Sequence, residues 1–166
     1  MRAGLISYPT VASPVSYDRA DHDYSTEQEP LPKGHAATHI GMFLAWAVFN
    51  GLENDFHRQH SAEHLARLRR REITGRQFFI AACKEKFAEK DLSPEGNAFA
   101  EYYYSGDAGE RGLYFTDYKK VLVAGLPSFW HVADTWANYD RIAPVISKRF
   151  EEWKAPPRKR WWQFWK

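Results

Sequence analysis

The feature that most constrains this fold is a helical segment without a polar face. Residues 37 to 52 read ATHIGMFLAWAVFNGL, so a helix built from them is apolar on almost every side. Such a helix must be covered all round by other parts of the chain. Thr38 is a suitable N-cap, which places His39 in the first turn, and Asn50-Gly51 is a stop signal. We therefore expect a central helix with the rest of the domain packed around it.

Helical patterns continue after the central segment. Leu65 and Leu68 are the apolar pair of a charged surface helix, and Thr74 can cap the helix that follows. Ser93-Pro94 opens a further helix, with Ser as the N-cap and Pro at the first helical position. No strand pattern of convincing length follows residue 35. The predicted class is all-α, a single compact domain of five or six helices around the central apolar helix, with an irregular N-terminal arm.

Two more helices are expected toward the C-terminal end of the domain. Thr116-Asp117 can start a short helix that Pro127 ends. The longer one carries an apolar stripe whose members are spaced by three and four residues. The stripe consists of Val132, Trp136, Tyr139, Ala143, Ile146, Phe150 and Trp153. Pro144 lies inside this segment and should kink or divide the helix.

Composition divides the chain into three regions. Residues 1–35 hold four prolines and no helical period, which predicts an irregular arm with short extended pieces at 5–8 and 15–17. Residues 36–154 are the helical domain, and residues 155–166 are a basic aromatic tail. The N-terminus lacks a secretory pattern, no apolar run approaches the ~20 residues of a membrane span, and the single cysteine excludes an internal disulfide. We expect a cytoplasmic protein, with peripheral attachment at the inner membrane face as an option.

The tail is the strongest candidate for a binding surface. Its KRWWQFWK end interleaves aromatic and basic residues, and a helical wheel places the aromatic rings on one side. Three destinations suit it: an anionic lipid surface, a groove on its own domain, or a protein partner. The residues assigned to partner or membrane binding are Arg158, Lys159, Arg160, Trp161, Trp162, Phe164 and Trp165.

The charge distribution favours protein or lipid partners over nucleic acid. The chain has 23 basic and 21 acidic residues, and five of the basic residues lie in the stretch 154–166. Eighteen basic and 21 acidic residues therefore remain elsewhere, and this mildly acidic body offers no broad basic surface. The run Arg69-Arg70-Arg71 suits a solvated helix C-terminus, where positive charge complements the helix dipole. We expect no nucleic-acid partner.

Three histidines raise the alternative of a metal site. On one continuous helix, the spacing of His57, His60 and His64 would place them on one side, where imidazoles could hold zinc. Ser61 looks like an N-cap that breaks this helix, and the spacing matches no established zinc motif. Cys83 lies in an apolar helical stretch and is expected to be a buried hydrophobic side chain. The sequence thus assigns no metal ligand and no cofactor.

A His–carboxylate pair is the most enzyme-like feature of the sequence. His131 and Asp134 are three residues apart and would touch on a helix, and such pairs orient many catalytic sites. No nucleophile is marked out beside them, and the chain has no GxSxG, glycine-rich phosphate loop or DxD pair. We therefore assign no catalytic residue and interpret His131 and Asp134 as a structural polar pair that fixes the last helix. His39 is interpreted as a capping-turn residue that faces the N-terminal arm.

Four segments of the chain resemble a bacterial domain family of unknown function. They are Thr38–Ala47 in ATHIGMFLAWA, Asp91–Ala100 in DLSPEGNAFA, Tyr114–Leu122, and His131–Tyr139 in HVADTWANY. The resemblance covers roughly residues 17 to 153 and leaves out the arm before it and the WWQFWK tail. It implies common descent but assigns no catalytic residue. Small bacterial proteins of this kind are often encoded beside secreted toxins as their immunity proteins, which is an argument from association.

The leading hypothesis is therefore a non-enzymatic bacterial binding protein. Its narrower form is an immunity protein that neutralises a cognate secreted toxin by direct binding. The first alternative is a peripheral membrane-associated protein anchored by its Trp-rich basic tail. The second is a metal-dependent enzyme that uses a histidine cluster.

Overall fold

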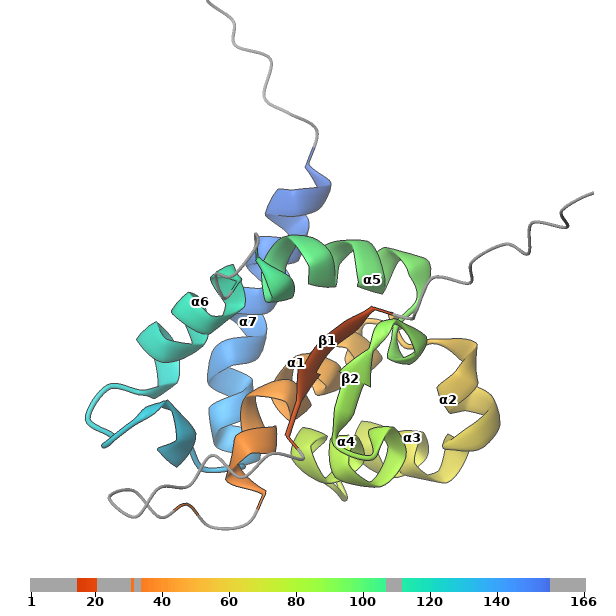
Figure 1. The fold of residues 1–166 in the computed structure, drawn as a ribbon, viewed down its shortest axis with the longest axis horizontal. Coiled ribbons are helices and arrows are strands. Elements are labelled where there is room, and N and C mark those ends of the chain that lie inside the picture. The colour runs from red at the N-terminus through yellow and green to blue at the C-terminus, as the bar shows by residue number, and fades with distance from the viewer. Residues whose placement is uncertain (1–14, 21–30, 32–33, 107–111, 156–166) are drawn as a thin grey trace, which may run out of the picture.

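The helices surround a central helix, as the sequence predicts (Figure 1). The computed structural model describes residues 15–20, 31, 34–106 and 112–155. The α-helices of this part of the chain are α1 (Thr38–Phe49), α2 (Asp55–His60), α3 (Ala62–Arg69), α4 (Gly75–Cys83), α5 (Pro94–Ala100), α6 (Leu113–Leu122) and α7 (Trp136–Lys154). Short helical turns are the 3-10 turns η1 (His35–Ala37), η2 (Glu89–Asp91) and η4 (Phe129–His131) and the π-helical turn η3 (Glu101–Ser105).

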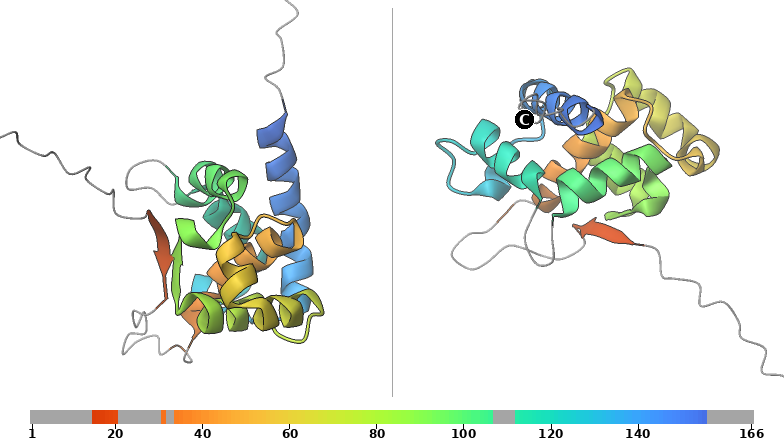
Figure 2. Two further views of the ribbon diagram at one scale, coloured as in Figure 1. Left: turned by 90° about the vertical axis from the view of Figure 1, so that its right-hand side faces the viewer. Right: turned by 90° about the horizontal axis from the view of Figure 1, so that it is seen from above.

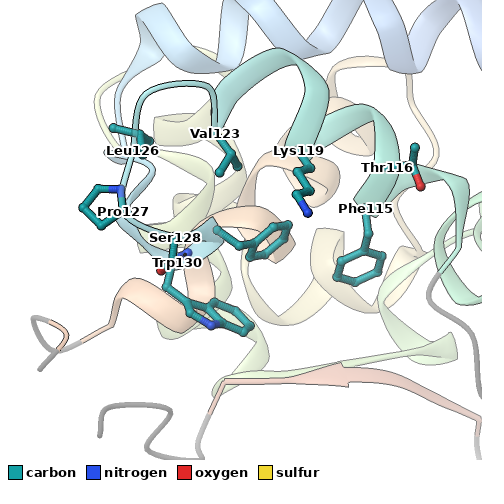
Figure 3. A pocket seen from close by; sticks show the side chains of 9 residues that line it. Phe115, Thr116, Lys119, Val123, Leu126, Pro127, Ser128 and Trp130 are labelled. Atoms are coloured by element: carbon teal, nitrogen blue, oxygen red, sulfur yellow. Dashed lines mark hydrogen bonds between the residues drawn. The ribbon is translucent and has the colours of Figure 1, made fainter. Parts of the chain in front are cut away.

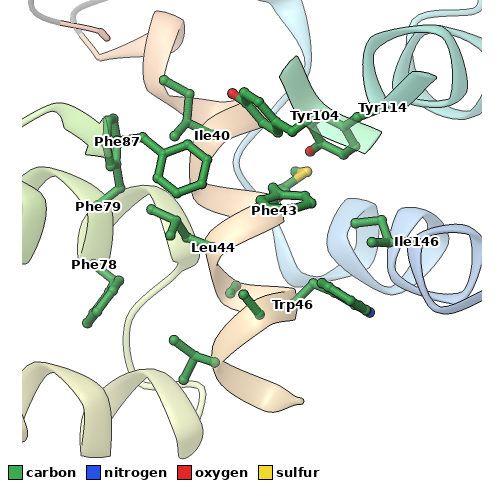
Figure 4. Packing of buried hydrophobic residues seen from close by; sticks show 14 of the residues in the cluster. Ile40, Phe43, Leu44, Trp46, Phe78, Phe79, Phe87, Tyr104, Tyr114 and Ile146 are labelled. Carbon is green, nitrogen blue, oxygen red and sulfur yellow. The ribbon is translucent and has the colours of Figure 1, made fainter. Parts of the chain in front are cut away.

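Helix α1 is buried on every side, which its sequence requires. Every residue from Thr38 to Val48 is buried, and Phe43 and Trp46 lie at the centre of the aromatic core (Figure 4). The two-stranded sheet and α7 lie on opposite sides of α1 (Figure 2). Tyr104 and Tyr114 complete the packing around Phe43, with ring centroids 5.0 and 5.4 Å from it. Burial of this many aromatic rings supplies much of the apolar area that stabilises the domain.

Helices α1 and α4 touch through their backbones at two glycines. A Cβ atom added to Gly41 would lie 2.3 Å from the Arg76 nitrogen, and one added to Gly75 would lie 2.0 Å from the Gly41 oxygen. Real Cβ atoms do not approach other atoms this closely, so both positions require glycine. The crossing holds the start of α4 against the first half of α1 and thereby fixes the direction in which α4 leaves the core.

A small antiparallel sheet is the part of the fold that the sequence pattern did not predict. Strand β1 (Ser16–Arg19) pairs with β2 (Lys86–Ala88), and Ser16 lies opposite Ala88. Residues 16–19 therefore form regular structure inside the segment expected to be irregular, and they overlap the extended piece expected at 15–17. The strands are too short to show a period of two, and their pairing depends on a partner far along the chain.

Several helix boundaries agree with the sequence signals. Thr74 and Gln77 form a capping box at the start of α4, and the Ser93 side chain accepts a hydrogen bond from the Gly96 N–H at the start of α5. The chain also breaks at Ser61, between α2 and α3. At Thr74 and Ser93 the signals are local side-chain to backbone hydrogen bonds, so they can be read without knowledge of the tertiary structure, whereas the Ser61 side chain forms no capping hydrogen bond.

Three boundaries differ from the prediction. The N-cap of α1 is Ala37 in place of Thr38. Helix α6 begins at Leu113, ahead of the predicted start at Thr116. Helix α7 begins only at Trp136, because Thr135 is extended and its side chain accepts a hydrogen bond from the Asn138 N–H. Val132 therefore precedes the helix that was expected to contain it. Pro144 lies inside α7 without dividing it.

The fold of the described residues includes seven α-helices in place of the five or six expected, together with the two-stranded sheet. Among these residues, no helix is both long enough and apolar enough to cross a bilayer.

Candidate functional site

The described surface contains an aromatic pocket of about 680 Å³ beside α6, which we call the α6 pocket (Figure 3). Figure 3 shows Phe115, Lys119 and Trp130 directed toward the same space from two sides. The lining residues are Phe115, Thr116, Lys119, Val123, Leu126, Pro127, Ser128, Phe129 and Trp130. This volume lies within the range of sites that receive a small molecule or a large side chain.

The α6 pocket forms because a helix face meets a tight loop. Phe115 and Lys119 are four residues apart on α6 and therefore share one side of the helix. After α6, Gly125 has a φ of 81°, a conformation that favours glycine and turns the chain back. The Ser128 side chain then accepts a hydrogen bond from the Trp130 N–H and starts η4, which carries Trp130 to the pocket.

His39 supports the aromatic wall of the α6 pocket from inside the domain. Its ring centroid lies 5.3 Å from that of Phe115, 5.2 Å from that of Phe129 and 5.6 Å from that of Trp130. His35 adds a further tie, because its Nδ1 lies 2.9 Å from the Trp130 carbonyl oxygen. The wall is therefore held by contacts from the start of the central helix, which favours a preformed pocket.

A buried hydrogen-bond network fixes His39 in turn. Its Nε2 lies 2.9 Å from an Asp18 carboxylate oxygen, and the Tyr104 hydroxyl donates to the same oxygen over 2.7 Å. Burial disfavours the Asp18 carboxylate, but the hydrogen bonds from His39, Tyr104 and the Arg19 N–H outweigh it and hold the pKa of Asp18 below its usual range. The predicted orientation of His39 toward the N-terminal segment is confirmed, since Asp18 belongs to β1.

The electrostatics of the α6 pocket are set by one ammonium group. Lys119 is the charged residue among the nine that line the pocket, and it forms no ion pair with any described residue. Lys120, its neighbour on α6, is exposed and does not line the pocket. The arrangement suits a ligand with an apolar or aromatic body and a negative group at its edge.

A second polar cluster lies in the core between α2, α4 and η2. His57, Cys83 and Asp91 are all buried, and each offers a potential ligand atom within 4.8 Å of the others. The His57 Nε2 lies 3.0 Å from an Asp91 carboxylate oxygen and 3.8 Å from the Cys83 sulfur. The Lys90 ammonium donates to the same Asp91 oxygen over 2.9 Å, and the Ala88 N–H donates to the other oxygen over 2.8 Å.

This cluster does not have the geometry of a Cys–His–Asp catalytic triad. A triad uses one imidazole nitrogen for the nucleophile and the other for the carboxylate, whereas here the His57 Nε2 faces both Cys83 and Asp91. Burial, together with the Asp91 carboxylate, raises the pKa of the Cys83 thiol well above its usual value. Burial also disfavours the Asp91 carboxylate, but hydrogen bonds from His57 and Lys90 outweigh it and lower the pKa of Asp91.

The histidines considered as a metal site do not come together. His57 is buried, His60 is exposed and His64 is half-buried on the next helix, because the chain breaks at Ser61 as predicted. The partners of His57 are instead Cys83 and Asp91, which come from distant parts of the sequence. Sequence reasoning therefore considered His57 together with His60 and His64, and not with the two residues that lie beside it in the structure.

The predicted contact between His131 and Asp134 is replaced by other bonds. Asp134 accepts hydrogen bonds from the Thr74 hydroxyl at 2.5 Å and pairs with the Arg76 guanidinium at 3.0 Å. His131 Nδ1 lies 3.0 Å from the Ser128 hydroxyl. The physical reason is that α7 begins only at Trp136, so no helix aligns the two side chains. Asp134 anchors the approach to α7 against α4, while His131 and Ser128 belong to the cap of η4.

The three consecutive arginines are all engaged by carboxylates. Arg69 pairs with buried Glu53 at 2.6 Å, and Arg70 pairs with Glu72 at 2.6 Å. Arg71 forms a two-pronged ion pair with Asp140 and lies over the Trp136 ring at 4.6 Å. The tail residues assigned to binding lie outside the described residues: Arg158, Lys159, Arg160, Trp161, Trp162, Phe164 and Trp165.

Sequence reasoning missed the pocket-forming residues. Phe115 and Phe129 are large apolar residues of the kind that usually fill a core. The loop around Gly125 has no periodicity that would show which of its side chains face a pocket. One available signal was an aromatic residue, Phe115, directly before the predicted helix start at Thr116, with Lys119 four positions later. A lysine on that face marks it as partly open to solvent.

A family model described as "Domain of unknown function (DUF7832)" matches residues 16–132. The matched span begins at β1 and ends just after η4, so it includes every residue that lines the α6 pocket. No curated protein and no solved structure matches the chain.

Proposed function

We propose that this chain, which belongs to the DUF7832 family of domains of unknown function, is a non-enzymatic binding protein. The proposal rests on the geometry of the structure. The binding site is the α6 pocket, and its occupant is an apolar or aromatic side chain of a protein partner presented next to a carboxylate. The observation that carries the proposal is a preformed aromatic pocket whose charged lining residue, Lys119, forms no ion pair with any residue that the structure describes.

The chemistry of the α6 pocket supports insertion of a single anchor residue. Protein interfaces concentrate their binding energy in a few aromatic or basic side chains that fill pockets. Phe115, Phe129 and Trp130 supply the apolar walls, and Lys119 can pair with an acidic neighbour of the inserted residue. Because His39 braces the wall from behind, binding requires little reordering of side chains, which lowers its entropic cost.

A binding role is favoured over catalysis by the placement of the reactive groups. The His39 and His57 side chains are 3% and 1% exposed, so neither imidazole faces a substrate site. Ser128 lines the α6 pocket, but its hydroxyl oxygen already accepts the Trp130 N–H and contacts His131 within a local helix cap. This leaves no nucleophile with a free general base among the groups that line the pocket.

The narrower proposal concerns the partner. We propose an immunity protein that acts in the cytoplasm and neutralises a cognate secreted toxin by direct binding. In this version the toxin inserts an apolar residue, flanked by an acidic one, into the α6 pocket, and the bound chain covers the toxin's active surface.

The test uses the products of genes encoded beside this one. Each product is expressed with the full-length chain, and growth protection is measured, followed by titration calorimetry of any protective pair. Protection and binding should be lost in Lys119→Glu and Trp130→Ala but retained in Lys120→Glu, which makes the same charge change outside the α6 pocket. If no neighbouring product is toxic or bound, the immunity version is wrong. If Lys119→Glu and Lys120→Glu behave alike in a bound pair, the pocket is not the site.

The composition of the tail supports a second proposal, attachment to an anionic membrane surface. Aromatic rings and cations together suit the lipid interface, and each Lys or Arg near such a surface is worth roughly 1 kcal/mol. The full chain should sediment with vesicles that contain anionic lipid, more weakly at high salt, and a chain ending at Lys154 should stay in solution. Equal sedimentation of both chains would exclude the tail as the anchor.

A further inference from the structure

We propose that His57, Cys83 and Asp91 bind a divalent transition-metal ion, with Zn²⁺ as the best match. The three residues come from α2, α4 and η2, which meet only in the folded core. A bound ion would join these three elements from the inside. The proposal concerns a site separate from the α6 pocket and does not depend on the proposed function.

The distances among the donor atoms are close to those that a zinc ion imposes. Metal–ligand distances of roughly 2.0 to 2.3 Å in a tetrahedron place neighbouring ligand atoms roughly 3.3 to 3.8 Å apart. In the structure, the His57 Nε2 lies 3.0 Å from the Asp91 oxygen and 3.8 Å from the Cys83 sulfur, and no two donor atoms are more than 4.8 Å apart. Side-chain shifts of about an ångström therefore suffice to surround an ion.

The donor chemistry selects the ion. A thiolate, an imidazole and a carboxylate together match the borderline softness of Zn²⁺ and do not match Mg²⁺ or Ca²⁺, which prefer oxygen ligands throughout. Three protein ligands are fewer than the four of a closed structural zinc site, so we expect weaker binding than at such sites.

The charges balance with and without the ion. Without it, the Lys90 ammonium neutralises the Asp91 carboxylate, and the Cys83 thiol is neutral. With it, the two positive charges are matched by the Asp91 carboxylate and a Cys83 thiolate. The thiol proton passes to solvent, and the proton on His57 Nε2 moves to Nδ1. Lys90 can leave because its side chain is 46% exposed.

The cluster is incompletely satisfied as a set of hydrogen bonds. The buried His57 Nδ1 has no hydrogen-bond partner among the described residues, and the Cys83 sulfur has a long 3.8 Å contact. Partly satisfied polar clusters in a core are costly, so such a cluster calls for an explanation. Lys84 and Glu85, directly after Cys83, both have positive φ values of 52° and 59°. This uncommon pair of conformations holds Cys83 at the end of α4 next to His57.

The experiment measures metal in the full-length, untagged chain. Elemental analysis of the purified protein should find Zn²⁺ at close to one equivalent after dialysis against Zn²⁺. Titration of the metal-free chain with Co²⁺ should give thiolate-to-cobalt charge-transfer absorption, which surface histidines cannot produce. The absorption should disappear in Cys83→Ser and His57→Ala and persist in His60→Ala, which removes an exposed histidine of the same helix. Absence of this absorption in the unsubstituted chain would overturn the proposal.

A second variant tests the site without removing a ligand. Lys90→Met removes the cation that competes for Asp91, so Co²⁺ should bind several-fold more tightly. Circular dichroism before titration establishes that each variant is folded. Unchanged or weaker Co²⁺ binding by folded Lys90→Met would contradict ligation by Asp91, and undiminished absorption in folded Cys83→Ser would contradict ligation by Cys83.

Discussion

Two His–carboxylate pairs have nearly identical geometry and different surroundings, one with a half-buried carboxylate and one fully buried. His39 lies 2.9 Å from Asp18, and His57 lies 3.0 Å from Asp91. The first pair is completed by the Tyr104 hydroxyl and by aromatic rings at the back of the α6 pocket. The second is completed by an ammonium group and a thiol.

We propose different roles for the two pairs because their surroundings differ. Neutral donors and rings around Asp18 hold one arrangement in place, which suits a rigid pocket wall. A displaceable cation and a soft donor around Asp91 leave the other pair able to accept an ion. The surroundings, more than the pair itself, decide what each imidazole can do.

The largest effect should come from breaking the second pair. Asp91→Ala leaves the Lys90 charge, the His57 imidazole and the Ala88 N–H without their acceptor, and Asp91 is fully buried. We expect the free energy of unfolding in urea to fall by about 3–5 kcal/mol. Asp55→Ala is the control, because this side chain is 72% exposed, and it should cost no more than about 0.5 kcal/mol. Equal losses in the two variants would contradict the buried network.

Breaking the first pair should cost less. Asp18 is 22% exposed, so water can partly replace its carboxylate after substitution. Asp18→Ala should lower the free energy of unfolding by about 2–3 kcal/mol. It should also weaken binding of the aromatic anion anilinonaphthalene sulfonate to the α6 pocket, because His39 supports the pocket wall. Asp91→Ala, measured where it is folded, should leave this dye binding unchanged. A dye affinity that responds to both substitutions equally would show that the two pairs are not independent.

Acid should lower the free energy of unfolding by weakening both pairs together. The loss should be smaller than in Asp91→Ala or Asp18→Ala, because a protonated carboxyl group still forms hydrogen bonds. The pKa values of Asp18 and Asp91 are lower in the folded protein than in the unfolded chain. Their stabilising contribution is therefore complete above the unfolded pKa, near 4, and is lost as the pH falls through the folded values. Urea unfolding between pH 7 and pH 2 should show this loss, and Asp18→Asn/Asp91→Asn should reduce the slope. An unchanged slope in the double variant would assign the acid sensitivity to other groups.

The smallest effect should come from one hydroxyl group of the first pair. Tyr104→Phe removes the 2.7 Å hydrogen bond to Asp18 and keeps the ring in the core. We expect a loss of about 1–2 kcal/mol in thermal or urea unfolding, since the acceptor is charged. Tyr102→Phe is a matched control because Tyr102 is exposed. Co²⁺ binding at Cys83 should be the same in both variants.

The features of this protein that the sequence predicts well are local ones, such as helix positions and helix boundaries. The all-round apolar segment gives the central helix, Thr74 and Ser93 mark helix boundaries through hydrogen bonds to their own neighbours, and the chain breaks at Ser61. The β1–β2 pairing and the neighbours of His57 join residues separated by 26 to 72 positions, as the pairs His57–Cys83 and Ser16–Ala88 illustrate. No periodic pattern encodes such contacts, so they appear only when the helices pack.

The position of β1 has a consequence for how the chain acquires its structure during synthesis. Its partner β2 is made about 70 residues later, which at the usual elongation rates of roughly 5 to 20 residues per second is a delay of roughly 4 to 14 s. During this time α1, apolar on every side, has left the ribosome without most of the helices that cover it. The nascent chain thus displays an unpaired strand and a bare hydrophobic helix for seconds. Its yield in cells should depend on chaperones that hold the strand until residue 88 has emerged and the helix until α7 has followed.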